Sequence, residues 1–386
     1  MTTRPLLNNQ KSFHQQISAP AVDTVFIGLI NHPTVYIWDA WVLKEETKLN
    51  LYNLASPRAF YESGDLDIQT QRDHLPHHWR LFTSEDHGKT WLDKGPVFAP
   101  RLDEPTKFDS RSIWTGSTIR YDDQVIATYT GIRQTDDEHP FIQSIGLAKW
   151  DESKHCFVRL TDDAIICPLR DYDLIKSKGY YLSAKEDLGS VDGEEGGCIL
   201  AWRDAGMVLD PNGQLHLLWS AKSSLNFKQE AVLGHGILHD PLGNPRFELL
   251  PPVFLPESQN FTQAEVPQIV YDARGGSYYL MVSTTDSQPG KSTDADVETR
   301  VEMYESSEIS MGWRHLGTLI QKSDKRYPGI LISAELDQAG GVHVVFTAPF
   351  NRVNSAEIIH TIPSLESVVL PSKRLVVGDV GLQLSA

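Results

Sequence analysis

Short apolar runs separated by polar turns recur along the whole chain. The runs are about four to eight residues long and end at Gly, Pro, Asn or Asp, which is the pattern of strands in an all-β protein. A weak helical period is found at 170–186 and in the first twenty residues. The pattern therefore predicts an all-β fold.

Five pairs of apolar runs are each joined by a polar turn of the length that hairpins favour. The turns fall at 43–46, 121–124, 209–213, 271–275 and 336–340. Successive turns are roughly 60–90 residues apart. This spacing is longer than an ordinary propeller blade, and long loops between the strands would account for the additional residues. Five units predict a five-bladed β-propeller with a central, funnel-shaped active site. A β-sandwich is the alternative, but five units divide awkwardly between two sheets.

We expect one domain over residues 1–386, with residues 1–29 as an N-terminal extension that packs on the propeller. The expected blades are 30–108, 109–196, 197–260, 261–322 and 323–386. The segment from Ser84 to Trp91 matches the S-x-D-x-G-x-T-W hairpin called an Asp-box. Its Asp caps a turn and its Gly permits a left-handed bend, so it indicates a blade and not a catalytic site.

Charge and cysteine content exclude several classes of protein. Thirty-five basic against 51 acidic residues give a net charge of −16, which argues against binding to nucleic acid or to anionic membranes. The three cysteines show no metal-ligand spacing and favour a reducing compartment. The sequence shows no signal peptide. We expect a cytoplasmic protein, or one secreted by an unrecognised or removed signal.

A histidine-rich segment, Asp73-His74-Leu75-Pro76-His77-His78, is the one candidate for a metal site. Loop histidines around a proline usually bind no metal, so we expect none. The sequence contains no cofactor motif either, and we expect no cofactor.

Carboxylates precede three of the five hairpins at matching positions. Asp39, Asp204 and Glu265 lie five, six and seven residues before Lys44, Asp210 and Asp272 of their turns, so they begin equivalent strands. Equivalent strands of a propeller converge on its axis, and acids gathered there are typical of glycoside cleavage. Asp39, between Trp38 and Trp41, would be the nucleophile. Asp204 would stabilise an oxocarbenium-like transition state, and Glu265 would be the general acid.

Each acid also has an ordinary interpretation. Asp39 fits an edge strand, Glu265 fits a solvated strand start, and Arg203-Asp204 fits a structural ion pair. Since neighbouring strand residues point to opposite faces, Arg203 can reach Asp204 only at a bend. The separation of the working carboxylates, which distinguishes retaining from inverting enzymes, stays open at this point.

Four motifs resemble those of glycoside hydrolase family 68, the levansucrase, inulosucrase and β-fructofuranosidase family, which is related to the invertases. They are Trp38-Asp39-Ala40-Trp41, Trp114-Thr115-Gly116-Ser117, Arg203-Asp204 and Glu265-Val266-Pro267. They follow the order of the family's W-D-[ST]-W, W-S-G-S, R-D-P and E-x-E-R-P. The resemblance spans about 30–350 and implies a five-bladed propeller, in agreement with the hairpins.

The resemblance implies a retaining β-fructosidase or fructosyltransferase that acts on sucrose or a related β-fructofuranoside, a small-molecule carbohydrate. Asp39 would be the nucleophile, Asp204 the transition-state stabiliser and Glu265 the acid/base. The residues that the resemblance assigns to substrate binding are Trp38, Trp114, Thr115, Arg203, Gln263 and Tyr327.

Three departures from the family pattern concern the leaving-group side. Ala205 replaces the family's Pro, Val266 replaces its Arg, and the segment 283–286 lacks the Arg or His that often faces glucose. Two alternatives therefore remain. One is another five-bladed-propeller glycosidase, arabinosidase-like or xylosidase-like and inverting, and the other is a non-catalytic glycan-binding propeller.

Overall fold

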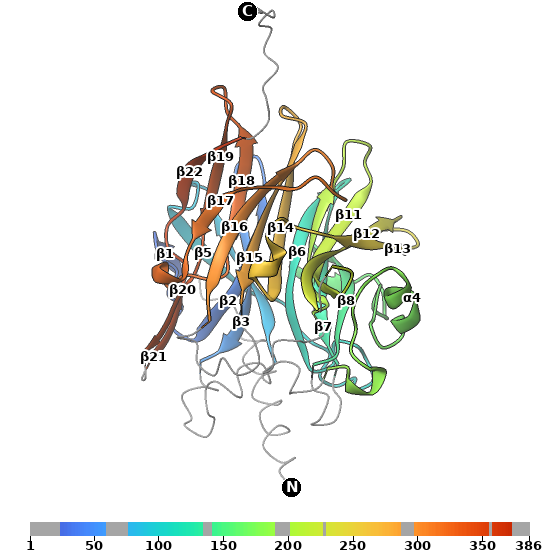
Figure 1. Ribbon diagram of the computed structural model, residues 1–386. Coiled ribbons are helices and arrows are strands. Elements are labelled where there is room, and N and C mark those ends of the chain that lie inside the picture. Colours follow the sequence, from blue (N-terminus) through green and yellow to red (C-terminus); the bar gives the residue numbers. More distant parts are fainter. Residues whose placement is uncertain are drawn as a thin grey trace, which may run out of the picture.

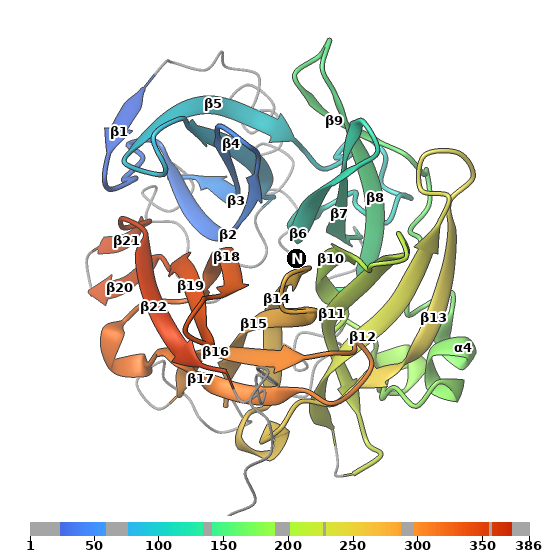
Figure 2. The same cartoon turned by 90° about the horizontal axis from the view of Figure 1, so that it is seen from above.

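Five antiparallel β-sheets surround a common axis in the computed structural model, which describes residues 24–58, 76–133, 141–189, 201–226, 229–286, 297–354 and 357–372 (Figure 1). Viewed from above, one edge strand of each sheet lies nearest the centre: β2 in the first sheet along the chain, then β6, β10, β14 and β18 (Figure 2). The fold is a five-bladed β-propeller, as the five hairpins predict. We number the blades I to V in chain order.

Blades I and II come from the first 160 residues. Blade I has the order β1-β5-β4-β3-β2, with β1 Val25–Ile27, β2 Val35–Lys44, β3 Leu49–Pro57, β4 His78–Ser84 and β5 Thr90–Phe98. Blade II consists of β6 Ser112–Tyr121, β7 Gln124–Ile132, β8 Gln143–Asp151 and β9 Cys156–Arg159. Strand β1 belongs to the expected N-terminal extension, whose residues 1–23 lie outside the described part of the chain.

Blades III to V follow the same pattern. Blade III is β10 Arg203–Leu209, β11 Leu215–Ser223, β12 Glu230–His239 and β13 Arg246–Val253. Blade IV is β14 Gln263–Asp272, β15 Ser277–Thr285, β16 Thr299–Ser306 and β17 Arg314–Ile320. Blade V is β18 Ile330–Leu336, β19 Gly341–Thr347 and β22 Glu366–Pro371, with a separate hairpin of β20 Phe350–Asn354 and β21 Glu357–Thr361.

Helices are short in the described residues. The period expected over 170–186 yields one α-helix, α4 Tyr172–Ser177, which ends before Gly179 because that residue takes a left-handed φ of 94°. Three 3₁₀ turns complete the set: η2 Lys185–Asp187, η3 Ser258–Asn260 and η4 Lys322–Asp324. None of these helices has the length and apolarity needed to cross a membrane.

The Asp-box turn has the structural role that its sequence predicts. The Asp86 carboxylate accepts hydrogen bonds from the Thr90 amide at 2.8 Å and the Thr90 hydroxyl at 2.7 Å. Gly88 has a φ of 82°, and Trp91 is buried. The bonds from Thr90 hold the pKa of Asp86 at about 2. The turn thus fixes the β4–β5 hairpin of blade I.

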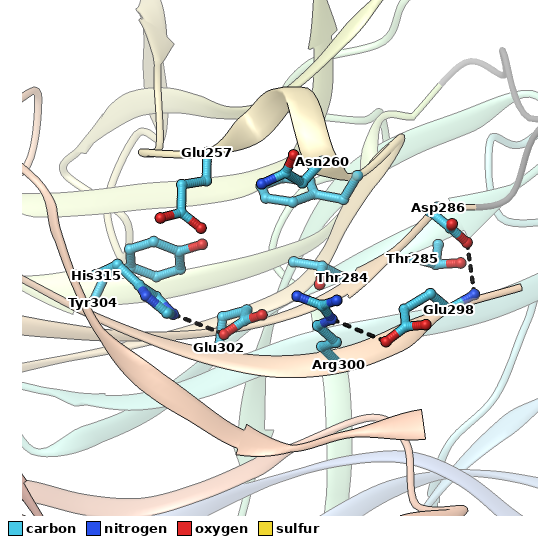
Figure 3. Close-up of a pocket in the computed structure, with 11 residues that line it drawn as sticks. Glu257, Asn260, Thr284, Thr285, Asp286, Glu298, Arg300, Glu302, Tyr304 and His315 are labelled. Carbon is cyan, nitrogen blue, oxygen red and sulfur yellow. Dashed lines mark hydrogen bonds and ion pairs between the residues drawn. The ribbon is translucent and has the colours of Figure 1, made fainter. Parts of the chain in front are cut away.

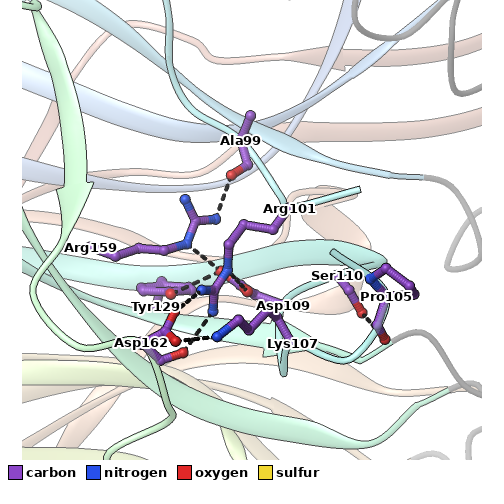
Figure 4. Close-up of polar contacts among 9 residues, drawn as sticks. All are labelled: Ala99, Arg101, Pro105, Lys107, Asp109, Ser110, Tyr129, Arg159 and Asp162. Atoms are coloured by element: carbon purple, nitrogen blue, oxygen red, sulfur yellow. Dashed lines mark hydrogen bonds and ion pairs between the residues drawn. The ribbon is translucent and has the colours of Figure 1, made fainter. Parts of the chain in front are cut away.

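Neighbouring blades are joined by apolar cores and, between blades I and II, by a buried ionic cluster. Asp109, fully buried between blades I and II, accepts hydrogen bonds from Arg101 and Arg159 at 2.6 Å each and from the Tyr129 hydroxyl at 3.0 Å (Figure 4). Arg101 also binds the exposed Asp162 at 2.6 Å. The carboxylate is therefore fully compensated by cations, as a buried charge requires.

The ring closes between blades V and I. Ile30 and Ile362 exchange two backbone hydrogen bonds, of 2.9 and 3.1 Å, and both side chains are buried. They pack in one core with Ile37 of β2 and with Ile330 and Ile332 of β18. The end of the described chain is thereby attached to its beginning without a covalent link.

A register shift recurs on the innermost strand of every blade, which we call its first strand although β1 precedes β2 in the chain. The pairing with the second strand skips at 37/40 in β2, 114/116 in β6, 203/206 in β10, 265/268 in β14 and 331/333 in β18. Such bulges bend a strand and re-aim its side chains. Five equivalent bulges around one axis therefore create five equivalent positions from which side chains can converge.

Candidate active site

The proposed catalytic residues lie at these bulges or directly beside them. Asp39 and Asp204 fall inside the shifts of β2 and β10, and Glu265 is the last paired residue before the shift of β14. In β6 the equivalent residue is Thr115, and in β18 it is Ile332. The spacing noticed in the sequence thus reflects one bulge position repeated in each blade.

Asp39 of blade I contacts blade II directly. The Thr115 hydroxyl donates a hydrogen bond to Asp39 Oδ2. The neighbouring Trp38 donates its indole N–H to the Ser56 hydroxyl at 2.7 Å, and its ring meets that of His77 edge-on at 6.0 Å. Trp114 precedes Thr115 in β6 and is half-buried against Phe141, 6.1 Å between ring centroids. Two tryptophans thus accompany the Asp39–Thr115 contact.

Arg203 joins the other two acids. Its guanidinium donates to Glu265 Oε1 at 2.5 Å and to Gln263 Oε1, and its Nε lies 3.5 Å from Asp204 Oδ2. Asp204 has a left-handed φ of 63°, so the chain turns at the point where Arg203 would otherwise face away. This supplies the bend that the sequence required. Arg203 and Asp204 therefore do form an ion pair, as one of the two interpretations of the sequence expected. This pair is one contact of a larger cluster that also contains Gln263 and Glu265.

Asp204 is buried among the other charges. Burial raises the pKa of its carboxyl well above the ordinary value, and the carboxylates of Asp39 and Glu265 raise it further, against the opposing effect of Arg203. The Val266 amide donates to Asp204 Oδ2 at 3.4 Å. Val266 itself has a φ of 48°, a conformation that β-branched residues rarely adopt and that is often found at functional sites.

Glu265 has a partner for each of its oxygens. Arg203 binds Oε1, and the Tyr327 hydroxyl donates to Oε2. Burial and the neighbouring Glu265 raise the pKa of Tyr327, so the phenol keeps its proton. Tyr327 reaches the site from the segment before β18, which places blade V beside blade IV at this point.

Direct contacts thus join seven of the nine predicted site residues in two groups. Asp39 contacts Thr115, and Arg203 contacts Asp204, Gln263 and Glu265, which also binds Tyr327. The charge of Asp39 acts on Asp204, so the two groups lie near each other. Trp38 and Trp114 are the strand neighbours of Asp39 and Thr115. Of the histidine-rich segment, residues 73–75 lie outside the described residues, and His77 instead contacts Ser112. No group of potential metal ligands occurs in the part of the chain that is described.

Two buried polar residues around the site did not stand out in the sequence. Gln143 accepts the Trp202 amide at 3.1 Å and approaches Arg203 at 3.5 Å. The Thr130 hydroxyl accepts the Asp204 amide at 2.9 Å. Both lie on strands of blade II and belong to no motif, and only their complete burial, which the sequence does not show, would have signalled them.

A pocket lies on blade IV (Figure 3). Thr284 and Thr285 contribute to its lining and are the ladder partners of Ala264 and Gln263. Four carboxylates line it as well: Glu257, Asp286, Glu298 and Glu302. Segment 283–286, which departs from the family pattern, therefore forms part of a hydroxyl-rich and acidic wall one strand away from the candidate site.

The chain is similar in one segment to a known protein family, and in its fold to several solved structures. Residues 59–171 match the glycosyl hydrolases family 32 N-terminal domain. No curated protein sequence matches the chain. Among solved structures, Bacillus subtilis levansucrase is similar at a TM-score of 0.58 and 14% identity, with 96% of each chain covered.

Two further structures show the same similarity. A mutant of B. megaterium levansucrase gives a TM-score of 0.58 at 15% identity over 95% of each chain. An inulosucrase from Halalkalicoccus jeotgali bound to kestose gives 0.56 at 18% identity, over 88% of this chain and 82% of the other. At these identities the similarity shows the fold. The family 32 model thus matches one segment of the chain, and a fold similar to that of the levansucrases extends over nearly its whole length.

Proposed function

We propose that the protein is a retaining β-fructosidase or fructosyltransferase that acts on sucrose or a related β-fructofuranoside. The observation that carries this proposal is the convergence of Asp39, Asp204 and Glu265 from three blades, with Arg203 bridging two of them. A pair of carboxylates supported by a third is what glycoside cleavage requires. The family relation directs the choice of substrate towards fructosides.

In the proposed mechanism Asp39 attacks the anomeric carbon of the fructosyl unit, and Glu265 protonates the oxygen of the leaving group. The resulting ester between Asp39 and fructose is then attacked by water or by a sugar hydroxyl, with Glu265 now accepting the proton. The Thr115 hydroxyl fixes the Asp39 carboxylate in position. Arg203 and Tyr327 hold Glu265 from both sides before the substrate arrives.

Asp204 would accept hydrogen bonds from fructose hydroxyls, and its negative charge would stabilise the oxocarbenium-like transition state. A fixed charge is worth more in a site that excludes water, and Asp204 is buried. Whether hydrolysis or transfer follows depends on what attacks the ester.

The leaving-group side carries less of the family pattern. Val266 replaces the family's Arg, its side chain is buried, and its amide serves Asp204. Arg203 is therefore the cation that contacts these acids among the described residues. We propose on this ground that the donor specificity extends beyond sucrose to fructosides with other leaving groups.

The deciding experiment measures glucose and fructose separately after incubation of the purified protein with sucrose and with a panel of β-fructofuranosides. Equal release identifies a hydrolase, and an excess of glucose identifies transfer. NMR of the first product tests retention, because an inverting arabinosidase-like enzyme would release the opposite anomer. Sugar binding without turnover on fructosides, arabinosides or xylosides would contradict the proposal and would indicate a glycan-binding propeller.

A further inference from the structure

Hydroxyl groups of blade II hold the bulge of blade III. Thr130, fully buried on β7, uses one hydroxyl for two contacts: it donates to the Thr115 carbonyl at 2.9 Å and accepts the Asp204 amide at 2.9 Å. Thr115 lies in the bulge of β6, and Asp204 lies in the bulge of β10. One side chain therefore connects the two bulges.

A backbone carbonyl on the other side of Asp204 is held in the same way. The Ala205 carbonyl accepts the Thr128 hydroxyl at 2.6 Å and the Ser117 hydroxyl at 2.9 Å. Thr128 and Thr130 lie two residues apart on β7, so both point towards blade III. The bulge of β10 is thus fixed by side chains of the neighbouring blade, before and after its left-handed residue.

These contacts replace hydrogen bonds that the sheet cannot supply. In the β10–β11 ladder Arg203 pairs with Ser220 and Gly206 with Leu218, so the residues between them have no regular partners there. The same holds for Thr115, which the β6–β7 register skips. Buried backbone groups need partners, and at these two bulges the Thr130 hydroxyl provides one for each.

The two bulges carry two different parts of the proposed chemistry. Thr115 binds the Asp39 carboxylate through its own hydroxyl, and Asp204 presents its carboxylate from the other bulge. A displacement of the Thr130 hydroxyl would move both. We propose that Thr130 is a positioning residue that fixes the proposed nucleophile, through Thr115, and the proposed stabiliser, Asp204, relative to each other. This inference rests on the proposed function for its catalytic consequence.

The test compares Thr130→Val, which keeps the shape and removes the hydroxyl, with Thr130→Ser, which keeps the hydroxyl. A matched control is Thr118→Val, because Thr118 is a buried threonine of β6 whose hydroxyl has no hydrogen-bond partner among the described residues. We expect Thr130→Val to lower kcat roughly 10–100-fold, the scale of a misplaced catalytic group, with KM changed less than about twofold. Thr130→Ser should recover most of the rate.

A double-mutant cycle with Asp204→Asn distinguishes a positioning role of Thr130 from a general disturbance of the structure. If Thr130 acts largely through Asp204, Thr130→Val should cost much less in the Asp204→Asn background than in the wild type. Equal losses in the two backgrounds, or the same loss in Thr118→Val, would overturn the inference. A fall in melting temperature with an unchanged kcat would also overturn it, because that is the signature of a purely structural threonine.

Hydrogen exchange measured by mass spectrometry on peptides that cover 202–209 gives a readout that needs no substrate. The Asp204 amide should exchange faster in Thr130→Val than in Thr130→Ser or Thr118→Val. Unchanged exchange would overturn the inference even in an active enzyme. If no variant, including the wild type, cleaves a fructoside, the proposed function fails, while faster exchange would still show that the hydroxyl holds Asp204.

Discussion

Asp204 is subject to opposing requirements from its environment and from its proposed role. It is buried, it faces two other carboxylates, and Arg203 is the cation in contact with it. Burial and like charges favour its protonated form, whereas the proposed role requires a negative charge when the transition state forms. Such a residue weakens the folded state in return for function, and this leads to predictions on both activity and stability.

Asp39→Asn should lower kcat by roughly 10³–10⁵-fold, because an amide cannot form the covalent ester while the Thr115 hydroxyl keeps a partner. Circular dichroism and the melting temperature serve as controls and should match the wild type. Turnover of the best fructoside within tenfold of the wild type would remove Asp39 from the proposed role.

Glu265→Ala should discriminate between leaving groups. A substrate such as sucrose needs its leaving oxygen protonated, whereas an aryl β-fructofuranoside with an acidic phenol does not. We expect kcat/KM to fall by roughly 10²–10⁴-fold for sucrose and far less for the aryl fructoside in the first step. Equal losses for both substrates would contradict a role as general acid.

Asp204→Asn should raise stability while it lowers kcat, roughly 10²–10³-fold. The folded-state pKa of Asp204 lies above its unfolded value of about 3.9, so the native state binds more protons over that interval and loses stability as the pH rises through it. At pH 7 the variant should melt about 1–3 °C higher than the wild type. The difference in melting temperature between the variant and the wild type should become smaller towards pH 4. A variant that melts at a lower temperature than the wild type at pH 7 would contradict this prediction.

At the scale of the element, the bulge of the first strand is the unit that builds the site. It occurs at the same place in all five blades. Between blades III and IV the backbones of the two first strands also approach very closely. Gly206 of β10 shows how close, because a Cβ added there would lie 2.2 Å from the Pro267 carbonyl oxygen of β14. The need for glycine at this position comes from the approach of two blades, not from a turn.

Gly206→Ala should therefore force blades III and IV apart. We expect a loss of about 1–3 kcal/mol in the free energy of unfolding, together with a lower kcat because Asp204 and Val266 lie beside the contact. The matched control is Gly317→Ala on β17, where the added Cβ would be 3.5 Å from Leu370, an ordinary contact. The control should change stability by less than about 1 kcal/mol and leave kcat unchanged. Similar behaviour of the two variants would refute the close-approach explanation.

At the scale of the whole molecule, the blades depend on contacts that cross between them. The Asp109 cluster joins blades I and II, and the Ile30–Ile362 pair closes the ring between blades V and I. Because the proposed site takes residues from all five blades, its geometry depends on the integrity of the ring.

Asp109→Asn should destabilise the protein by roughly 3–5 kcal/mol, since the fully buried Asp109 carboxylate pairs with both Arg101 and Arg159, and both would lose that partner. Asp162→Asn, at a position that is 69% exposed, should cost about 0–1 kcal/mol. Denaturant unfolding of both variants measures the difference. Comparable losses of unfolding free energy in the two variants would show that burial does not increase the contribution of the Asp109 ion pairs to stability.

Much of the fold could be predicted because it follows from local patterns of apolar, polar and turn-forming residues. Hairpin turns such as 209–213 are set by neighbouring residues, and five of them at similar spacing predicted the propeller. The weak period at 170–186 was less informative, because Gly179 ended the helix after six residues. The acids Asp39, Asp204 and Glu265 stood out because they occupy matching places in a repeat.

The sequence by itself determined which strands form, how many blades there are and which acids begin equivalent strands, since these follow from the alternation of apolar and polar residues along the chain. Only the tertiary structure decided how those acids meet. The left-handed turn at Asp204 brings Arg203 and Asp204 into one cluster, the Arg203–Glu265 ion pair joins residues 62 positions apart, and the Thr130 hydroxyl binds the Asp204 amide 74 positions away. Such contacts depend on the packing of one blade against the next, and no local pattern encodes that packing.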